Sequence, residues 1–199
     1  MSDLQRKLLK ALIVGKPNVG KSTLLNFLVG EKVSIVSRKA QTTQRNTTGV
    51  ITKNESQLVF FDTPGLNKIE KNIKISENFK AVAESVDLLI YMVDNRKKSQ
   101  SIDDQFSSWL NNNEGRFRKK ILLVNKIDSI EKVKLLEITK KINEVIYFDE
   151  TFFISLSKKS GVEGLMRWID KQAYSSNWIF EENYKNNTGK KKFLSELTR

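Results

Sequence analysis

Short apolar runs alternate with longer amphipathic stretches along most of this chain. The apolar runs predict strands at Leu8–Val14, Gly49–Lys53, Leu58–Asp62, Leu88–Asp94, Ile121–Asn125 and Thr151–Ile154. The amphipathic stretches predict helices at Lys21–Val29, Ile75–Val86, Asp103–Asn112, Glu131–Asn143 and Val162–Gln172. Such an alternation is typical of a parallel sheet covered by helices. We therefore predict an α/β fold whose six-stranded, mostly parallel sheet carries helices on both faces.

Two segments depart from this alternation. The stretch Glu31–Thr48 shows neither the hydrophobic pattern of a strand nor that of a helix, so we predict a long loop. Loops of that length in compact domains are usually functional or disordered. Beyond Tyr174 the periodicity fades into a polar stretch and the basic run Lys190–Lys192. We expect one domain over residues 1–173, followed by a linker and the first turns of a further helix over residues 174–199.

The segment Gly15–Ser22 has the two glycines, lysine and hydroxyl residue of a phosphate-binding loop, between a predicted strand and a predicted helix. Its glycines let backbone amides approach a polyphosphate at a helix N-terminus. Lys21 would reach the β- and γ-phosphates, and Ser22 would bind Mg²⁺. The alternative is a chance match in a glycine-containing turn, which the strand and helix on either side disfavour. The residues expected to contact nucleotide are Gly15, Lys16, Pro17, Asn18, Val19, Gly20, Lys21, Ser22 and Thr23.

A second motif, Asp62–Gly65, begins at the end of a predicted buried strand, where open α/β sheets place their ligands. Asp62 would hold Mg²⁺ through water, and the Gly65 amide would contact the γ-phosphate and report its loss on hydrolysis. Thr63 and Pro64 lie between them. A plain β-turn would explain Pro64 and Gly65, but not an aspartate at the end of a buried strand.

A third motif, Asn125, Lys126 and Asp128, follows another predicted buried strand. The Asp128 carboxylate can accept from both N1–H and N2–H₂ of guanine, whereas adenine offers no such pair of donors. Asn125 would tie this loop to the phosphate loop, and the Lys126 stem would lie along the face of the base. The alternative is a solvated loop end. With the other two motifs present, the pattern favours GTP and GDP as ligands.

After the last predicted strand, Ser155, Leu156 and Ser157 would supply backbone amides to guanine O6. GTP-hydrolysing proteins usually carry serine followed by alanine there, so Leu156 is a departure from the pattern. Because the contact is made by the main chain, we expect it to survive the change.

Composition narrows the chemistry further. The 199 residues contain no cysteine and no histidine, which excludes disulfides, thiolate chemistry and the commonest general base. Carboxylates, hydroxyls, lysines and a hard metal remain, and these suit phosphoryl transfer. The net charge of +12 favours polyanionic partners such as RNA or anionic lipid, although a solvated lysine face explains it equally well. With no signal peptide or membrane-spanning run, we expect a cytoplasmic protein, with peripheral contact at the inner face of the cell membrane left open.

Nearly the whole chain, to about Lys171, resembles the Era-type GTPases, an Era-like branch of the P-loop GTPases with a Ras-like fold. The likeness rests on the segment Ser37–Arg45, on Pro17–Asn26 and on Asp62–Leu66. By this resemblance, Thr43, or alternatively Thr42, completes the Mg²⁺ shell in the GTP state. Phe193–Glu196 resembles the entry to the KH domain of this family, and we expect that domain to be absent here.

The resemblance leaves the source of catalysis open. Leu66 stands where Ras-like proteins carry a glutamine that positions water, and an apolar side chain cannot do this. Relatives use a P-loop asparagine, here Asn18, to help bind K⁺, so K⁺ is a hypothesis for this chain. Arg38 and Arg45 are competing candidates for charge stabilisation, but RNA contact or plain solvation is the favoured interpretation of both. The catalytic set implied is Lys21, Thr43, Gly65 and Asn18, and the metal set is Ser22, Thr43 and Asp62.

The resemblance implies a monomeric, slowly hydrolysing GTP switch. Its partners would be the small ribosomal subunit and its rRNA, contacted through the missing KH domain during subunit assembly. Two alternatives stand beside this one. The chain could be a solitary GTP-binding interaction module with little turnover, or an Era-branch GTPase linked to tRNA modification. The Ala40–Thr43 sequence favours the Era type over the latter.

Overall fold

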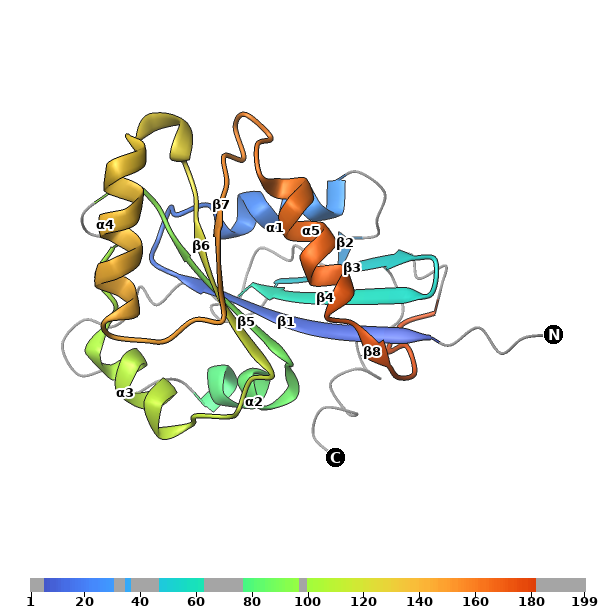
Figure 1. Ribbon diagram of the computed structural model, residues 1–199. Coiled ribbons are helices and arrows are strands. Elements are labelled where there is room, and N and C mark those ends of the chain that lie inside the picture. The colour runs from blue at the N-terminus through green and yellow to red at the C-terminus, as the bar shows by residue number, and fades with distance from the viewer. Residues whose placement is uncertain (1–5, 31–34, 37–46, 63–76, 97–99, 182–199) are drawn as a thin grey trace, which may run out of the picture.

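The computed structural model describes residues 6–30, 35–36, 47–62, 77–96 and 100–181 (Figure 1). Its strands are β1 (Lys7–Gly15), β2 (Ile35–Val36), β3 (Thr47–Lys53), β4 (Ser56–Asp62), β5 (Leu88–Val93), β6 (Lys119–Val124), β7 (Glu150–Phe153) and β8 (Tyr174–Ser175). Its helices are α1 (Lys21–Gly30), α2 (Glu77–Ser85), α3 (Asp104–Asn112), α4 (Lys132–Asn143) and α5 (Val162–Lys171), with a short 3₁₀ helix, η3 (Ile127–Ser129).

Within the described residues the strands form one sheet in the order β2-β3-β4-β1-β5-β6-β7, with β8 paired to β1. Strands β4, β1, β5, β6 and β7 run parallel, whereas β3 pairs antiparallel with β4, β2 with β3, and β8 with β1. The strand order reverses at β1, and such a switch point is where α/β sheets place their ligands. The loop that follows β1 is therefore at the position expected for a binding site.

The predicted α/β class and mostly parallel sheet are confirmed. All six predicted strands are present, with ends that differ by at most two residues. The sheet also contains β2 and β8, each of two residues, which are too short to leave a period in the sequence. Strand β2 lies inside the stretch predicted as a long loop. Residues 75 and 76 of the predicted second helix lie outside the described residues.

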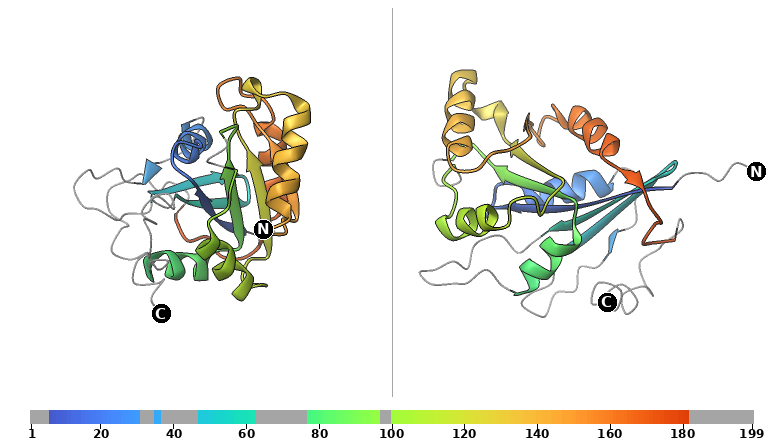
Figure 2. Two further views of the ribbon diagram at one scale, coloured as in Figure 1. Left: turned by 90° about the vertical axis from the view of Figure 1, so that its left-hand side faces the viewer. Right: turned by 60° about the horizontal axis from the view of Figure 1, so that its bottom comes forward.

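Helices cover both faces of the sheet (Figure 2). On one face, α1 and α5 pack Leu24 and Leu165 against residues such as Ile13 and Ile90. The strands alternate their side chains between faces, so neighbouring positions pack with α2, α3 and α4 on the other side. There Phe106 of α3 stacks on Tyr91 of β5, with ring centroids 5.5 Å apart. Because both faces are buried, the central strands are continuous apolar runs.

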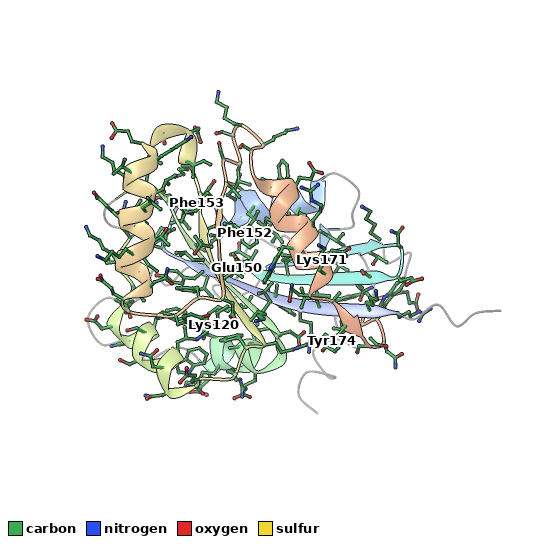
Figure 3. The ribbon with its side chains drawn as sticks, viewed as in Figure 1. Lys120, Glu150, Phe152, Phe153, Lys171 and Tyr174 are labelled. Atoms are coloured by element: carbon green, nitrogen blue, oxygen red, sulfur yellow. The ribbon has the colours of Figure 1, made fainter. Side chains whose placement is uncertain are left out.

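The edge strand β7 shows this alternation in two adjacent residues (Figure 3). Phe152 packs on Trp168 of α5, with ring centroids 5.5 Å apart, while Phe153 packs with the cluster under α2, α3 and α4. Strand β7 thus contributes to both cores from the sheet edge that lies between α4 and α5 in Figure 1.

The start of the predicted linker packs on the sheet. Strand β8 pairs with Lys7 and Leu8, and the Trp178 indole N–H donates to the carbonyl oxygens of Lys7 and Glu55. Phe180 is buried. The expected boundary at residue 173 precedes these contacts, and a linker remains a prediction for the residues after 181. Within the described parts of the chain, every helix is too short or too polar to cross a lipid bilayer.

Candidate nucleotide-binding site

The loop between β1 and α1 is closed so tightly that its two framing glycines leave no room for a side chain. A Cβ on Gly15 would lie 2.2 Å from the carbonyl oxygen of Met92. Gly20 has a φ of +109°, and a Cβ there would lie 2.5 Å from Nδ2 of Asn125. The loop backbone can therefore lie directly against β5 and the loop that follows β6, which a phosphate cradle requires.

Lys21, the first residue of α1, is buried and folds back over the loop. Its Nζ donates to the carbonyl oxygens of Gly15 and Lys16, both at 2.9 Å. Burial lowers the pKa of Lys21, and the nearby Asp62 carboxylate opposes this shift. The ammonium group is thus held at the loop by neutral carbonyls, a place from which it can meet a phosphate.

Asp62, at the end of β4, faces Ser22 at the start of α1. The Ser22 hydroxyl donates to Oδ2 of Asp62 at 2.8 Å, while the buried Oδ1 has no hydrogen-bond partner among the described residues. Burial raises the pKa of Asp62, and the Ser22 hydrogen bond and the Lys21 charge offset this only in part. A buried carboxylate oxygen without a partner is costly unless a ligand or water satisfies it.

This pair fits the expected Mg²⁺. The ion takes oxygen ligands and is usually held by one or two carboxylates together with substrate phosphates, not by an all-protein cage. Among the described residues, no three acidic side chains gather into such a cage. The hydroxyl of Ser22 and the unpartnered oxygen of Asp62 are therefore the residues that would hold the metal beside a bound phosphate.

Asn125 connects the loop after β6 to two other parts of the site. Its Nδ2 donates to the carbonyl oxygen of Val19 at 2.9 Å, and its Oδ1 accepts from the amide of Leu156 at 3.3 Å. The Asn125 side chain is buried, so both bonds are shielded from water. One amide group thereby fixes the distance between the phosphate loop, the loop after β6 and the loop after β7.

Asp128 lies in η3 with an exposed carboxylate. The Ser155 hydroxyl donates to its Oδ1 at 2.5 Å, and Ser157 Oγ lies 3.0 Å from Ser155 Oγ. The Ser155 hydrogen bond is the main cause that lowers the pKa of Asp128. The carboxylate is thus ionised at neutral pH, and Ser155 fixes its orientation. An acceptor of two N–H donors needs both properties.

Lys126 adopts the left-handed region with a φ of +62°, a strained conformation for a residue with a side chain. Its Nζ donates to the carbonyl oxygen of Asn18 at 2.9 Å and to Asp94 at 2.8 Å. Asp94 lies beside this site, as does Arg96, which donates to Asp94 and to the Pro17 carbonyl, and our sequence reasoning missed both residues. The available signal was the position of Asp94 at the end of a buried strand, the same signal that singled out Asp62.

The remaining predicted residues divide into two groups. Lys16 donates to the Ser101 hydroxyl at 2.6 Å, and Pro17, Asn18 and Thr23 are exposed around the loop. The residues that lie outside the described part of the chain are Thr42, Thr43, Thr63, Pro64, Gly65, Leu66, Arg38 and Arg45.

A glycine-framed loop between β1 and α1, a buried Lys21 and the Ser22–Asp62 pair define a P-loop nucleotide-binding protein of the α/β class. The family model described as "50S ribosome-binding GTPase" matches residues 10–126. The chain is 34% identical over 189 residues to GTPase Era of Agrobacterium fabrum, a match that spans 94% of this chain and 59% of that protein. It is 36% identical over 183 residues to the GTP-binding protein ERG of Arabidopsis thaliana, spanning 87% of this chain and 42% of that protein.

Solved structures agree. An Era structure in complex with MgGDPNP and nucleotides 1506–1542 of 16S ribosomal RNA has a TM-score of 0.65 at 31% identity, covering 90% of this chain and 61% of that one. A variant of Era from Aquifex aeolicus bound to GDP and AlF4⁻ has a TM-score of 0.64 at 30% identity, covering 91% and 62%. The chain thus spans about three fifths of the length of its Era relatives. The chain belongs to the family described as "50S ribosome-binding GTPase", and within it to the Era type.

Proposed function

We propose that this chain binds GTP and GDP with Mg²⁺ and hydrolyses GTP slowly, as a molecular switch of the Era type. The observation that carries the proposal is the link between base loop and phosphate loop. Asn125 bonds to Val19, and three residues further on Asp128 is held as an ionised acceptor by Ser155. A guanine base and its phosphates would therefore be recognised by one rigid unit.

Different residues of this chain are assigned to the phosphates and to the metal during hydrolysis. Lys21 moves its ammonium from the loop carbonyls to the β- and γ-phosphates, and Ser22 and Asp62 orient toward the metal. Mg²⁺ held by Ser22 and Asp62 would supply charge neutralisation for phosphoryl transfer. Thr43 and Gly65 remain the proposed contacts to the metal and the γ-phosphate. By likeness to GTPases that lack a supplied arginine, unaided turnover should be slow, on the order of 10⁻⁴–10⁻² s⁻¹.

Asn18 is the proposed K⁺ contact. Its φ of +59° keeps it in the left-handed region, which asparagine tolerates better than most residues, and its side chain is exposed at the loop. Turnover measured in KCl should exceed turnover in NaCl, and Asn18→Ala should remove the difference. Equal rates in the two salts would remove K⁺ from the proposal without touching nucleotide binding.

Asp128→Asn tests the guanine assignment. The change leaves the shape of the side chain but replaces one acceptor with an amide donor, so guanine loses a partner for its N–H donors. GDP affinity should fall about 100-fold or more. Xanthine carries an oxygen where guanine carries N2, so the new amide should bind xanthosine diphosphate better than wild type does. A variant that keeps its GDP affinity would contradict the proposal, and a gain for the xanthine nucleotide serves as the folding control.

The partner of this switch is proposed to be the small ribosomal subunit, during its assembly. Support comes from the Era relative solved with 16S ribosomal RNA and from the net charge of +12, which favours a polyanion. Cosedimentation of this chain with small subunits, with GDPNP and with GDP, tests the idea. Weak binding of the chain alone is expected, because RNA contact in this proposal depends on a KH domain. Tight, nucleotide-independent binding to rRNA would contradict it.

A further inference from the structure

Asp94 forms a buried ionic junction beside the phosphate loop. Its side chain, at the end of β5, is 0% exposed. Oδ2 accepts from Nε of Arg96 at 2.8 Å and from Nζ of Lys126 at 2.8 Å, and Oδ1 accepts from the Arg96 amide at 3.1 Å. We call Asp94, Arg96 and Lys126 the Asp94 bridge. A buried carboxylate is stable only when it is paired and bonded in this way.

Both cations of the Asp94 bridge reach the same stretch of the phosphate loop. Arg96 donates through NH2 to the carbonyl oxygen of Pro17 at 2.8 Å. Lys126 donates to the carbonyl oxygen of the next residue, Asn18, at 2.9 Å. Two consecutive carbonyls are therefore held on the side of the loop that faces β5 and β6.

Because each carbonyl shares a planar peptide with the next residue's amide, holding these two carbonyls also fixes the direction of two amides. In a planar trans peptide the N–H points away from the C=O of the same unit. The Pro17 carbonyl shares its peptide with the Asn18 amide, and the Asn18 carbonyl shares its peptide with the Val19 amide. Drawing the two carbonyls toward the Asp94 bridge therefore turns the Asn18 and Val19 N–H groups to the opposite side of the loop. Those are the donors that a phosphate needs.

We propose that Asp94 and Arg96 are positioning residues that orient the Asn18 and Val19 amides for the phosphates of the bound nucleotide. This inference rests on the proposed function, because it takes the phosphates of the bound nucleotide to be the ligand of the oriented amides. Neither residue belongs to the three nucleotide motifs recognised in the sequence. Arg96 makes its two contacts through different nitrogens of one rigid, planar guanidinium, Nε to Asp94 and NH2 to the Pro17 carbonyl, so the position of that carbonyl relative to Asp94 is fixed.

Arg96→Ala tests the proposal. In this variant Lys126 still pairs with the buried Asp94 carboxylate, so the fold should be retained, and a thermal melt beside wild type checks this. GDP affinity in Mg²⁺ should fall about tenfold, the size expected for losing one charge-assisted hydrogen bond. Inosine diphosphate lacks the guanine amino group, so the ratio of GDP to IDP affinity reports base recognition alone. Because the phosphates are common to both ligands, this ratio should not change.

Amide NMR supplies a second readout. On addition of GDP to wild type, the Asn18 and Val19 amides should shift strongly, as should those near Asp128. In Arg96→Ala the first two shifts should shrink and the third should persist. Arg96→Lys keeps the charge but replaces the two nitrogens that bond Asp94 and Pro17 with one, so it should fold normally and show most of the GDP affinity loss of Arg96→Ala. Arg167→Ala removes another arginine ion pair, on the exposed face of α5, and is the matched control.

The outcomes separate this inference from the proposed function. Wild type that fails to bind GDP would overturn the proposed function itself. Wild type that binds GDP, with Arg96→Ala binding equally well or with a reduced GDP to IDP ratio, would overturn only the positioning role. In a cycle with Asp94→Asn, the effect of Arg96→Ala should become smaller, and fully additive losses would contradict the bridge.

Discussion

Asp62 is buried, and within the described part of the chain only one of its two carboxylate oxygens has a hydrogen-bond partner. Without a metal, the ionised form costs folding free energy, which is why the pKa of this carboxyl lies above its usual value. A ligand that satisfies Oδ1 therefore relieves a local penalty. The same residue thus connects the stability of the empty site to the affinity of the loaded one.

The raised pKa of Asp62 predicts the pH dependence of Mg²⁺ binding. Metal binding needs the carboxylate, so Mg²⁺ affinity in the presence of GDP should fall as pH drops through the raised pKa. The fall should begin above the ordinary aspartate pKa of about 3.9. The stability of the ligand-free protein depends on pH in the opposite direction. Its native state holds the Asp62 proton more tightly than the unfolded state, so the contribution of Asp62 to stability declines as pH rises through the same interval.

Asp62→Asn separates the two effects. The variant should keep or gain thermal stability without ligand and should lose the Mg²⁺ dependence of GDP binding. Fluorescent GDP titrations with and without Mg²⁺, from pH 5 upward, measure this. A variant that retains the Mg²⁺ dependence would show that Asp62 does not serve the metal.

Gly20→Ala should damage the site through Asn125. The added Cβ would meet Nδ2 of Asn125 at 2.5 Å, at a φ of +109° that side chains rarely adopt. We expect a loss of about 2 kcal/mol or more in unfolding free energy and a clear loss of GDP affinity. Gly164→Ala is the control, because nothing lies within 4 Å of its new Cβ, and alanine in α5 should stabilise by roughly 0.5–1 kcal/mol. Equal urea midpoints for the two variants would contradict the packing argument.

At the scale of elements, β4 connects the C-terminal segment to the site. Its Gln57 is fully buried, accepting from the amides of Ile179 and Phe180 and donating to the Phe180 carbonyl, at 3.0, 3.0 and 2.9 Å. Five residues later the same strand ends at Asp62. The segment after α5 is thus held by a side-chain amide that takes the place of a strand partner.

Gln57→Ala should free this segment. It removes the Gln57 hydrogen bonds to the Ile179 amide and to the buried amide and carbonyl of Phe180, so the unfolding free energy should fall by about 2–4 kcal/mol. Hydrogen exchange at the Ile179 and Phe180 amides should accelerate at the same time. Gln172→Ala removes a glutamine with a single long bond to Trp168 and is the control. Unchanged hydrogen exchange at the amides of residues 179 and 180 would contradict this role of Gln57.

Sequence pattern predicted long elements better than the contacts between loops. Strands buried on both faces are continuous apolar runs, so the motifs at their carboxyl ends could be located without coordinates. Strand β8 and Gln57 could not, because a two-residue strand has no period and a lone glutamine carries no motif. Asp94 was recognisable by its position, but its pairing with Arg96 and Lys126 depends on how β5, β6 and the phosphate loop meet in space.

At the scale of the whole molecule, the parallel strands bring together residues that are far apart in the sequence. Gly15, Asp62, Asp94, Asn125 and Ser155 each lie at or just after the carboxyl end of a strand. The net charge of +12 on the chain favours polyphosphates whatever base they carry. Charge alone therefore cannot give base selectivity, which must come from Asp128 and its neighbours.

In our proposal one rigid site selects guanine and holds its phosphates with magnesium. Calorimetric titration of the wild-type chain with GDP and with ADP, in the same Mg²⁺ buffer, measures this selectivity. GDP should bind at least about 1,000-fold more tightly than ADP, because adenine leaves the Asp128 carboxylate without its two donors. Comparable affinities for the two nucleotides, or no binding of GDP, would contradict the account.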